Sequence, residues 1–417
     1  MKKVLFITFY WPPSGKASLH WPMKIIKHLP KFGWQPIVLT VKEDTFSAKD
    51  ESLLSEVDPN LEVIKTDYFD PFIYYRKFLG KSKYEPLIAS ETISTSNKSL
   101  KHKITVWIRM NLFVPDARVG WNRIAIKETK KYLKKNPVDA IVSVGPPHSS
   151  HLIGKKLGRL FNLPHFPVLI DPWIDISYYR DFKRNPLTLS LDKYFEKSIM
   201  KSASKVIFVT ESMKNDFIVR YNWLRNKSDV LYWGYNEEDF EGLQPKLKND
   251  YEILLHAGNI FDYQNPINFW STIKKEIDKG RKLRIKFIGT VSPGIKNSIE
   301  QNGLTSYTEY SGFLPYKNVL VEMLSADYLL VCATEKRHVP GKLFEYLRTG
   351  KPIIAFGDDN EEVKNIIGEA NAGYLYSYKN NADDFFEKAK QLISNTNVIK
   401  KYDRLTVAEK MSNILLK

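Results

Sequence analysis

A predicted helix between two apolar segments constrains the fold of this chain more than any other feature. An apolar run at positions 327–333, in which only Asp327 is charged, precedes it, and a second apolar run at positions 353–356 follows it. Short apolar segments bounded by turn residues are typical of buried parallel strands. Between them, Pro340 and Gly341 favour the start of a helix, and Gly350 favours its end. The sequence therefore predicts a strand–loop–helix–strand unit of an α/β fold.

The charged residues of this helix admit two interpretations. A helix N-terminus that follows a parallel strand is a site for anions, because its free N–H groups and its dipole favour negative charge. Lys342 stands in the first turn and Glu345 one turn later on the same face. A cation beside a phosphate and a carboxylate that accepts from sugar hydroxyls fit a nucleotide-sugar pocket. Alternatively, Lys342, Glu345 and Arg348 form only a solvated charged face.

Length and charge limit the classes of protein to consider. A chain of 417 residues predicts two or three domains. The 63 Lys and Arg residues outnumber the 47 Asp and Glu residues, which gives a formal charge of +16. This excess favours an anionic partner such as lipid headgroups, nucleic acid or a phosphorylated substrate. Nucleic acid is the weaker interpretation, because the basic residues are spread over the chain and match no known binding module.

The sequence also indicates a cytoplasmic protein. Cys332 is the only cysteine, and it lies in an apolar segment, which fits a reducing compartment. The apolar segment near the N-terminus is short and ends at Pro12 and Pro13, so a first buried strand is expected rather than a signal peptide. No apolar stretch approaches the length of a membrane span. An anionic membrane surface is nevertheless a candidate partner for the basic and aromatic region 67–121.

Two consecutive series of strands and helices predict two Rossmann-like domains that face a central cleft. The expected boundaries are 1–235, with an atypical insertion at 67–121, then 236–398, then a C-terminal helix at 399–417 that packs back on the first domain. Strands are expected at 4–10, 37–41, 140–144, 166–170, 205–210, 229–232, 251–257, 283–288 and 305–310. Helices are expected at 123–135, 152–161, 189–202, 267–279, 316–325, 360–369, 383–394 and 405–417.

Several predicted strands end in loops that carry candidate ligand-binding residues. Gly15 and Lys16 follow the first strand, where a glycine lets the backbone approach a phosphate and a lysine can pair with it. His148 ends a Gly-Pro-Pro-His segment after strand 140–144, the position at which a general base would be presented, and His151 could support it. An ordinary turn at Gly15 and a structural His148 are the alternatives. Neither an Asp-x-Asp motif nor a His/Cys cluster is present, so no metal site is predicted.

The order of these segments resembles the retaining GT-B glycosyltransferases of family four. The segment Val-Pro-Gly-Lys-Leu-Phe-Glu-Tyr at 339–346 is its most specific match. Further matches are the loop at 9–15, the strand-end His148, the Asp-Pro-Trp segment that begins at Asp171, and the glycine loop at Gly258 and Asn259. The resemblance covers nearly the whole chain except region 67–121.

The resemblance implies a metal-independent, retaining transfer from a nucleotide-diphospho-sugar, which is a co-substrate, without any cofactor. The second domain would bind the donor, and the first would bind a hydroxyl acceptor, either a glycan or a lipid-linked sugar in surface polysaccharide synthesis. His148 would be the catalytic residue, with His151 and Asp171 on the acceptor side. The implied donor-binding residues are Gly15, Lys16, Gly258, Asn259, Phe313, Arg337, Gly341, Lys342 and Glu345.

Three features of the sequence depart from the pattern of that family. Arg337 occupies the place of the first of its two paired glutamates, and Asn259 and Gln264 replace its usual basic pair. Lys16 and Ser18 stand where small glycines are common. Lys342, Arg337 and Lys16 are candidate replacement cations, because a diphosphate needs positive charge rather than one residue type. A non-catalytic GT-B-like subunit that binds a sugar nucleotide or a partner enzyme is the alternative to an enzyme.

Overall fold

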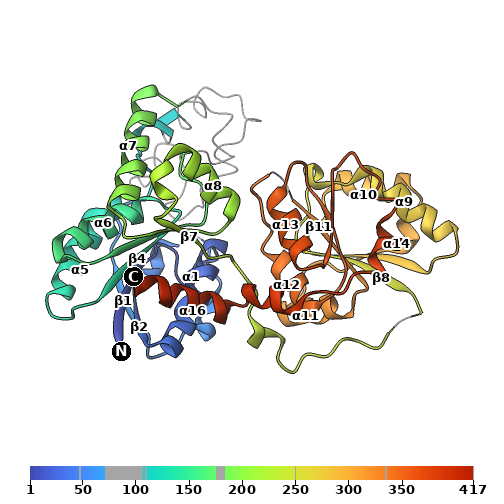
Figure 1. The fold of residues 1–417 in the computed structure, drawn as a ribbon, viewed down its shortest axis with the longest axis horizontal. Helices are drawn as coiled ribbons and strands as arrows, with labels where there is room; N and C mark the ends of the chain where they lie inside the picture. Colours follow the sequence, from blue (N-terminus) through green and yellow to red (C-terminus); the bar gives the residue numbers. More distant parts are fainter. Residues whose placement is uncertain are drawn as a thin grey trace. The chain divides into compact units, whose positions relative to one another are not determined.

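The computed structural model describes residues 1–46, 48–70, 107–108, 110–174, 184–248, 250–333 and 336–416. The described chain divides into two compact units. Unit 1 comprises residues 1–209, 213–231 and those from Ala408 onward, and unit 2 comprises residues 210–212 and 232–407. Each unit is an α/β domain (Figure 1). Most of the expected insertion at 67–121 lies outside the described residues.

Unit 1 is built on a parallel sheet whose described strands follow the order β3-β2-β1-β4-β5-β6-β7. β1 pairs with β2 on one side and β4 on the other, so the direction of winding reverses between β1 and β4. Open α/β sheets bind ligands beyond the carboxyl ends of the strands at this reversal. The strands are β1 (Lys2–Ile7), β2 (Trp34–Val41), β3 (Glu62–Thr66), β4 (Ala140–Gly145), β5 (His165–Leu169), β6 (Val206–Phe208) and β7 (Ser228–Val230).

Apolar helix faces cover this sheet. Ile153 and Leu157, one turn apart on α6, are fully buried in a cluster that includes Leu5 of β1 and Ile141 of β4. Burial of side chains of this size stabilises the fold by about 1.5–3 kcal/mol each. The helices that lie wholly or mostly in unit 1 are α1 (His20–His28), α5 (Asn122–Leu133), α6 (Ser149–Phe161), α7 (Pro186–Ser202), α8 (Glu211–Arg220) and, at the end of the chain, α16 (Arg404–Leu415).

Unit 2 contains a second parallel sheet, with described strands in the order β10-β9-β8-β11-β12-β13. β8 pairs with β9 and β11, so its carboxyl end lies at the reversal of this sheet. The strands are β8 (Glu252–Ala257), β9 (Leu283–Ile288), β10 (Thr308–Tyr310), β11 (Tyr328–Cys332), β12 (Ile353–Phe356) and β13 (Gly373–Tyr376).

The helices of unit 2 lie between these strands along the chain, except for the last two, which follow β13. They are α9 (Ile267–Asp278), α10 (Pro293–Gln301), α11 (Tyr316–Ser325), α12 (Lys342–Thr349), α13 (Glu361–Glu369), α14 (Phe385–Ala389) and α15 (Thr396–Ile399). Short 3-10 helices in the two units cover Ala17–Leu19, Leu29–Phe32, Glu43–Thr45, Glu51–Glu56, Val119–Trp121, Asn222–Leu224, Glu237–Phe240, Asp262–Gln264, Thr305–Tyr307 and Lys400–Tyr402. None of the described helices is both long enough and apolar enough to cross a membrane.

The α/β fold class is confirmed, while several element boundaries differ from the expectation. The helix that was expected at 383–394 is wrong in length, since α14 ends at Ala389. Strand β10 is shorter than expected, because residues Thr305–Tyr307 form a 3-10 helix instead. β3, α10 and β13 were not predicted. Gly350 ends α12 with a left-handed backbone, as its position in the sequence indicates.

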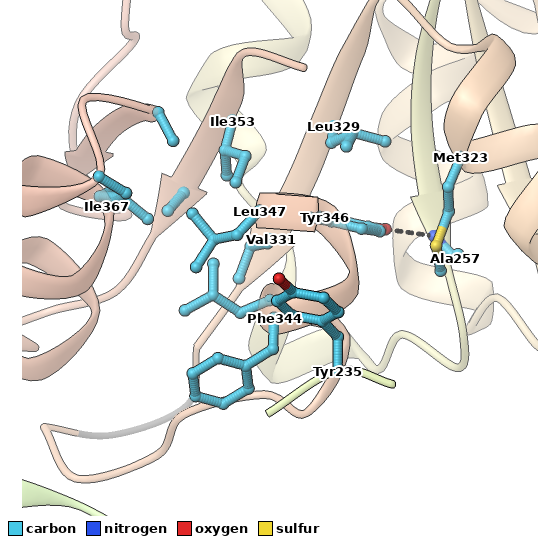
Figure 2. Close-up of a cluster of buried hydrophobic side chains, with 14 of the residues drawn as sticks. Tyr235, Ala257, Met323, Leu329, Val331, Phe344, Tyr346, Leu347, Ile353 and Ile367 are labelled. Atoms are coloured by element: carbon cyan, nitrogen blue, oxygen red, sulfur yellow. Dashed lines mark hydrogen bonds between the residues drawn. The ribbon is translucent and has the colours of Figure 1, made fainter. Parts of the chain in front are cut away.

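The core of unit 2 holds α12 firmly against the sheet. Leu343, Phe344, Tyr346 and Leu347 of α12 are fully buried among apolar side chains of β8, β11 and β12 (Figure 2). Tyr346 also makes a polar contact there, because its hydroxyl accepts a hydrogen bond of 2.7 Å from the backbone N–H of Ala257. This bond pairs an N–H group at the carboxyl end of β8 and sets the position of α12 relative to that strand.

The bond between Tyr346 and Ala257 should contribute measurably to stability. Tyr346→Phe leaves the buried N–H of Ala257 without a partner, so the free energy of unfolding should fall by about 1–3 kcal/mol in a urea titration. Tyr374→Phe is the control, since the Tyr374 hydroxyl has no hydrogen bond within the described residues, and it should change stability by less than about 0.5 kcal/mol. Equal effects of the two changes would contradict this role of Tyr346.

Candidate functional site

Glycine residues bring three strand-end loops of unit 2 together. Gly258, Gly289 and Gly312 follow β8, β9 and β10, and all three have positive φ angles. The N–H of Gly289 donates to the carbonyl of Gly312 at 2.6 Å. A side chain at position 289 would stand 2.8 Å from the backbone of Gly258, so only glycine allows the first two loops to pack this closely. The result is a layer of closely packed backbone at the carboxyl end of the sheet, in which Gly258 and Gly289 are half-buried and Gly312 is exposed.

Lys342 reaches across this layer from the first turn of α12. Its Nζ lies 3.0 Å from Nε2 of His256, near the end of β8. A Cβ atom at Gly258 would stand 2.9 Å from the same Nζ, and the φ angle of +105° at Gly258 also disfavours a side chain. Gly258 therefore leaves the space that the ammonium group occupies.

His256 is held neutral beneath Lys342. Its Nδ1 lies 3.0 Å from the carbonyl oxygen of Leu330, so Nδ1 carries the proton and Nε2 accepts from the Lys342 ammonium. Burial, and then the charge of Lys342, hold the pKa of His256 well below its ordinary value. His256 therefore orients the lysine without neutralising its charge.

Lys342 keeps its charge at neutral pH although it is largely withdrawn from water. Burial lowers its pKa from 10.5 to about 8, and the charge of Glu345 only partly opposes this effect. Within the described residues no carboxylate forms an ion pair with Lys342. An ammonium group that is held beside strand-end backbone without a carboxylate partner is suited to binding an anion.

Glu345 lies one turn further along α12. The Tyr316 hydroxyl, at the first residue of α11, donates to Oε1 of Glu345 at 2.8 Å. Burial raises the pKa of Glu345, while the bond from Tyr316 and the charge of Arg404 oppose that rise. In the described part of the chain Tyr316 is the only hydrogen-bond donor to this carboxylate, so lone pairs remain for hydroxyl groups of a ligand.

The other polar and charged candidate residues near α12 have different surroundings from Lys342 and Glu345. Arg348 forms a two-pronged ion pair with Glu237, and its guanidinium lies 5.0 Å from the centre of the Phe240 ring, so it has a structural role. Arg337 is half-buried in the loop that leads to α12. Asn259 uses its Oδ1 to accept from the N–H of Thr290 at 2.9 Å, which joins the loops after β8 and β9. The solvated-face interpretation therefore does not describe Lys342, Glu345 or Arg348.

The remaining donor-side candidates are more exposed. Gly341 is the residue before α12, and Phe313 is 91 % exposed in the loop after β10. Gly15 and Lys16 are exposed in unit 1 beyond the carboxyl end of β1, where the N–H of Gly15 donates to the carbonyl of Ala48 at 3.0 Å. Their proposed contacts with a donor stay predictions.

His148 in unit 1 is buried rather than presented to solvent. Its ring stacks on Trp173 with the ring centres 4.8 Å apart and the planes at 10°. Burial lowers its pKa to about 4, and the backbone of Pro172 only partly offsets this. His148 is therefore neutral at pH 7 and a weak base. Trp173 lies 25 positions further along the chain, so no local sequence pattern indicates that it covers the histidine.

Next to His148, His151 belongs to a row of buried, hydrogen-bonded polar side chains. Oγ of Ser143 on β4 lies 2.8 Å from Nδ1 of His151 and 2.7 Å from Nε2 of His165. Burial holds the pKa of His151 well below its ordinary value and lowers that of His165 to about 3. A Cβ atom at Gly145 would collide with His151 at 2.6 Å and with His148 at 2.9 Å, which requires glycine there. His151 thus joins α6 to the sheet.

Asp171 is the acceptor-side candidate with an available carboxylate. It follows β5, and burial alone raises its pKa to about 6. Among the described residues its side chain has neither a hydrogen-bond donor nor an ion-pair partner.

Asp116 is another half-buried aspartate of unit 1, and no sequence pattern predicted its role. Its carboxylate accepts from the N–H and the hydroxyl of Ser149 at 2.7 and 2.9 Å, and so caps α6 from a position 33 residues away.

The burial of Lys342 predicts an unusual titration. Competitive acetylation followed by mass spectrometry should give a midpoint near pH 8 for Lys342, because burial disfavours its charged form. As the pH rises through this midpoint the ammonium loses its proton, so the affinity for a dianion such as inorganic phosphate should fall. A midpoint near the ordinary 10.5 would contradict the burial of this side chain.

Comparisons with known proteins agree with this architecture. Residues 238–410 match the family model described as Glycosyl transferases group 1. The comparison with curated proteins gives no match. Among solved structures, a glycosyltransferase from Rickettsia africae ESF-5 is similar with 13 % identity and a TM-score of 0.63, over 100 % of this chain and 99 % of that chain.

Two further structures resemble the whole chain. Sucrose-phosphate synthase from Thermosynechococcus elongatus has 12 % identity and a TM-score of 0.59, over 99 % of this chain and 98 % of that chain. HepE from Anabaena, solved in complex with UDP and glucose, has 12 % identity and a TM-score of 0.60 over 100 % of both chains. The chain therefore has the GT-B fold, and the group 1 match, which covers most of unit 2, supports a glycosyltransferase.

Proposed function

We propose that the protein transfers a sugar from a nucleotide-diphospho-sugar to a hydroxyl acceptor, with the donor on unit 2 and the acceptor on unit 1. The observation that carries this proposal is the Lys342 ammonium, which is held above Gly258 against neutral His256. It lies in the group 1 domain, at the first turn of a helix that follows a parallel strand. Helix dipole, backbone N–H groups and lysine all favour a diphosphate there.

Glu345 supplies the second part of donor recognition. A carboxylate that keeps free lone pairs can accept from the two hydroxyls of a ribose. Tyr316 restricts the orientation of Glu345 through its 2.8 Å bond. The nucleotide would thus lie along α12, with the diphosphate at its first turn and the ribose one turn later.

The reaction breaks the bond between the anomeric carbon and the diphosphate oxygen and forms a bond from that carbon to the acceptor oxygen. The electron pair of the broken bond goes to the diphosphate, which gains negative charge in the transition state. Lys342 stabilises this added charge more strongly than the charge of the ground state, and such differential stabilisation is what accelerates a reaction. The proton of the acceptor hydroxyl passes to the departing diphosphate.

The acceptor residues act by position rather than as strong bases. Because burial lowers the pKa of His148 to about 4, we infer that this residue and Trp173 shape the acceptor pocket. Asp171 is better suited to accept a hydrogen bond from the acceptor hydroxyl, since its carboxylate is unpaired within the described residues.

We further infer the finer properties that the family resemblance implies. The transfer retains the configuration of the sugar and needs no metal, since Lys342 supplies positive charge at the diphosphate. The acceptor is a glycan or a lipid-linked sugar of surface polysaccharide synthesis. A cytoplasmic enzyme at the inner face of a membrane would meet both substrates.

Arg337 favours one alternative function. It stands where the family has the first of two glutamates, and a missing carboxylate there is compatible with a subunit that binds a sugar nucleotide without turnover. Release of free sugar from a donor without acceptor distinguishes the two functions. Tight donor binding with no release from any donor would contradict the enzyme and favour the subunit.

Donor binding by α12 can be tested by thermal shift with UDP, GDP, ADP and dTDP. A nucleotide at about a hundred times its dissociation constant should stabilise the protein by about 2.7 kcal/mol. Lys342→Ala should weaken binding about tenfold or more, because a charge-assisted hydrogen bond contributes about 1.5–3 kcal/mol. Glu345→Ala should have an effect of similar size.

Arg348→Ala is the matched control, since Arg348 lies on the same helix but pairs with Glu237. It should lower the unfolding temperature of the free protein and leave the nucleotide-induced shift intact. An unchanged shift in both Lys342→Ala and Glu345→Ala would place the donor elsewhere.

A further inference from the structure

The two acidic residues of α7 both point into the protein. Asp192 accepts from Nε1 of Trp173 at 2.7 Å and pairs with Arg184 at 2.8 Å. One turn later, Glu196 pairs with Arg220 at 2.8 Å, and both carboxylates are buried. The outer face of α7 consequently carries no negative charge.

That outer face combines large apolar side chains with lysines. Leu187, Leu191 and Tyr194 are 77 %, 43 % and 64 % exposed, and their spacing of four and three residues puts them in one stripe along the helix. Lys193 and Lys197 are exposed beside the stripe, and Lys201 is exposed near the end of the helix. Within the described residues none of these three lysines has an ion-pair partner.

The neighbouring helix α6 extends this surface. α6 contains no acidic residue, and it exposes Lys156, Arg159 and Leu160, the last of these to 44 %. A bond from Lys155 to Ser198 joins α6 to α7, which run next to each other in unit 1 (Figure 1). Partial burial, and then the charge of Arg159, lower the pKa of Lys155, as expected where cations crowd together.

We propose that this α6–α7 face, which comprises Lys156, Arg159, Leu160, Leu187, Leu191, Lys193, Tyr194, Lys197 and Lys201, binds the surface of an anionic lipid bilayer. Leucine and tyrosine side chains enter the boundary between headgroups and acyl chains, and lysines around them meet anionic headgroups. The proposal deepens the proposed function by naming the surface that would bring the acceptor side to a membrane.

Other occupants fit this face less well. A second copy of the chain in a symmetric dimer would set cation against cation, because a two-fold contact uses the same surface twice. A nucleic acid would satisfy the lysines but would leave the leucine stripe in water. A bilayer is the occupant that uses both kinds of side chain.

Sedimentation of the full-length protein with vesicles tests the proposal. It should bind vesicles of equal parts phosphatidylcholine and phosphatidylglycerol, and about 0.5 M NaCl should release most of it. Phosphatidylcholine vesicles alone should bind it poorly. Lys193→Glu/Lys197→Glu and Leu191→Ser/Tyr194→Ser should each weaken binding to the anionic vesicles about tenfold or more.

The matched control is Lys282→Glu/Lys400→Glu, which changes the net charge equally on exposed lysines of unit 2. It should retain binding within about threefold. Equal binding to both kinds of vesicle, or full binding by both α7 variants, would overturn the proposal. So would a wild-type dimer that the Leu191→Ser/Tyr194→Ser change dissociates.

A separate readout keeps this proposal distinct from the proposed function. The nucleotide-induced thermal shift, measured without vesicles, should be the same in wild type and in both α7 variants, because they lie outside the group 1 domain. Failure of vesicle binding with an intact shift would overturn only the membrane surface. Vesicle binding with no shift for any nucleotide would overturn only the donor site.

Discussion

The contact of α12 with the carboxyl end of β8 is the interaction on which the donor site depends. The Tyr346 hydroxyl accepts from Ala257, the last residue of the strand, and Lys342 lies one turn earlier on the same face of the helix. Because residues four apart share a helix face, the bond that fixes the helix also directs the lysine toward Gly258. Glu345 faces a different neighbour and is held by Tyr316 of α11. A helix of eight residues thus presents a cation and a carboxylate in fixed positions.

Positive charge serves two different purposes in this protein. Lys342 is largely buried against a neutral histidine, in surroundings of low polarity where a single charge interacts strongly with an anion. The lysines of the α6–α7 face are surrounded by water and act together over a longer range that salt screens. The formal charge of +16 does not separate these roles, whereas the burial of each side chain does.

The sequence was most informative where local signals and buried segments agree. β12 and α11 match their expected bounds, because apolar runs and helix-start residues mark them clearly. α10 was missed because Pro293 and Gly294 resemble a turn, although proline is also favoured at the start of a helix. Strand β3 mixes polar and apolar residues without a clear alternation, so it was not predicted. Contacts such as Tyr316 with Glu345 depend on how α11 packs against α12, which no local pattern encodes. His256 was identifiable in principle, since it stands two positions before Gly258 at the end of a predicted strand.

The central claim is that the end of β8 and the first turn of α12 bind the diphosphate of a nucleotide. Hydrogen–deuterium exchange of the full-length protein with and without UDP tests it most directly. We expect the largest protection at residues 257–260 and 341–346, where backbone N–H groups would contact the phosphates and the helix would be held more firmly. Saturating UDP that protects other segments while leaving both of these unchanged would contradict the account.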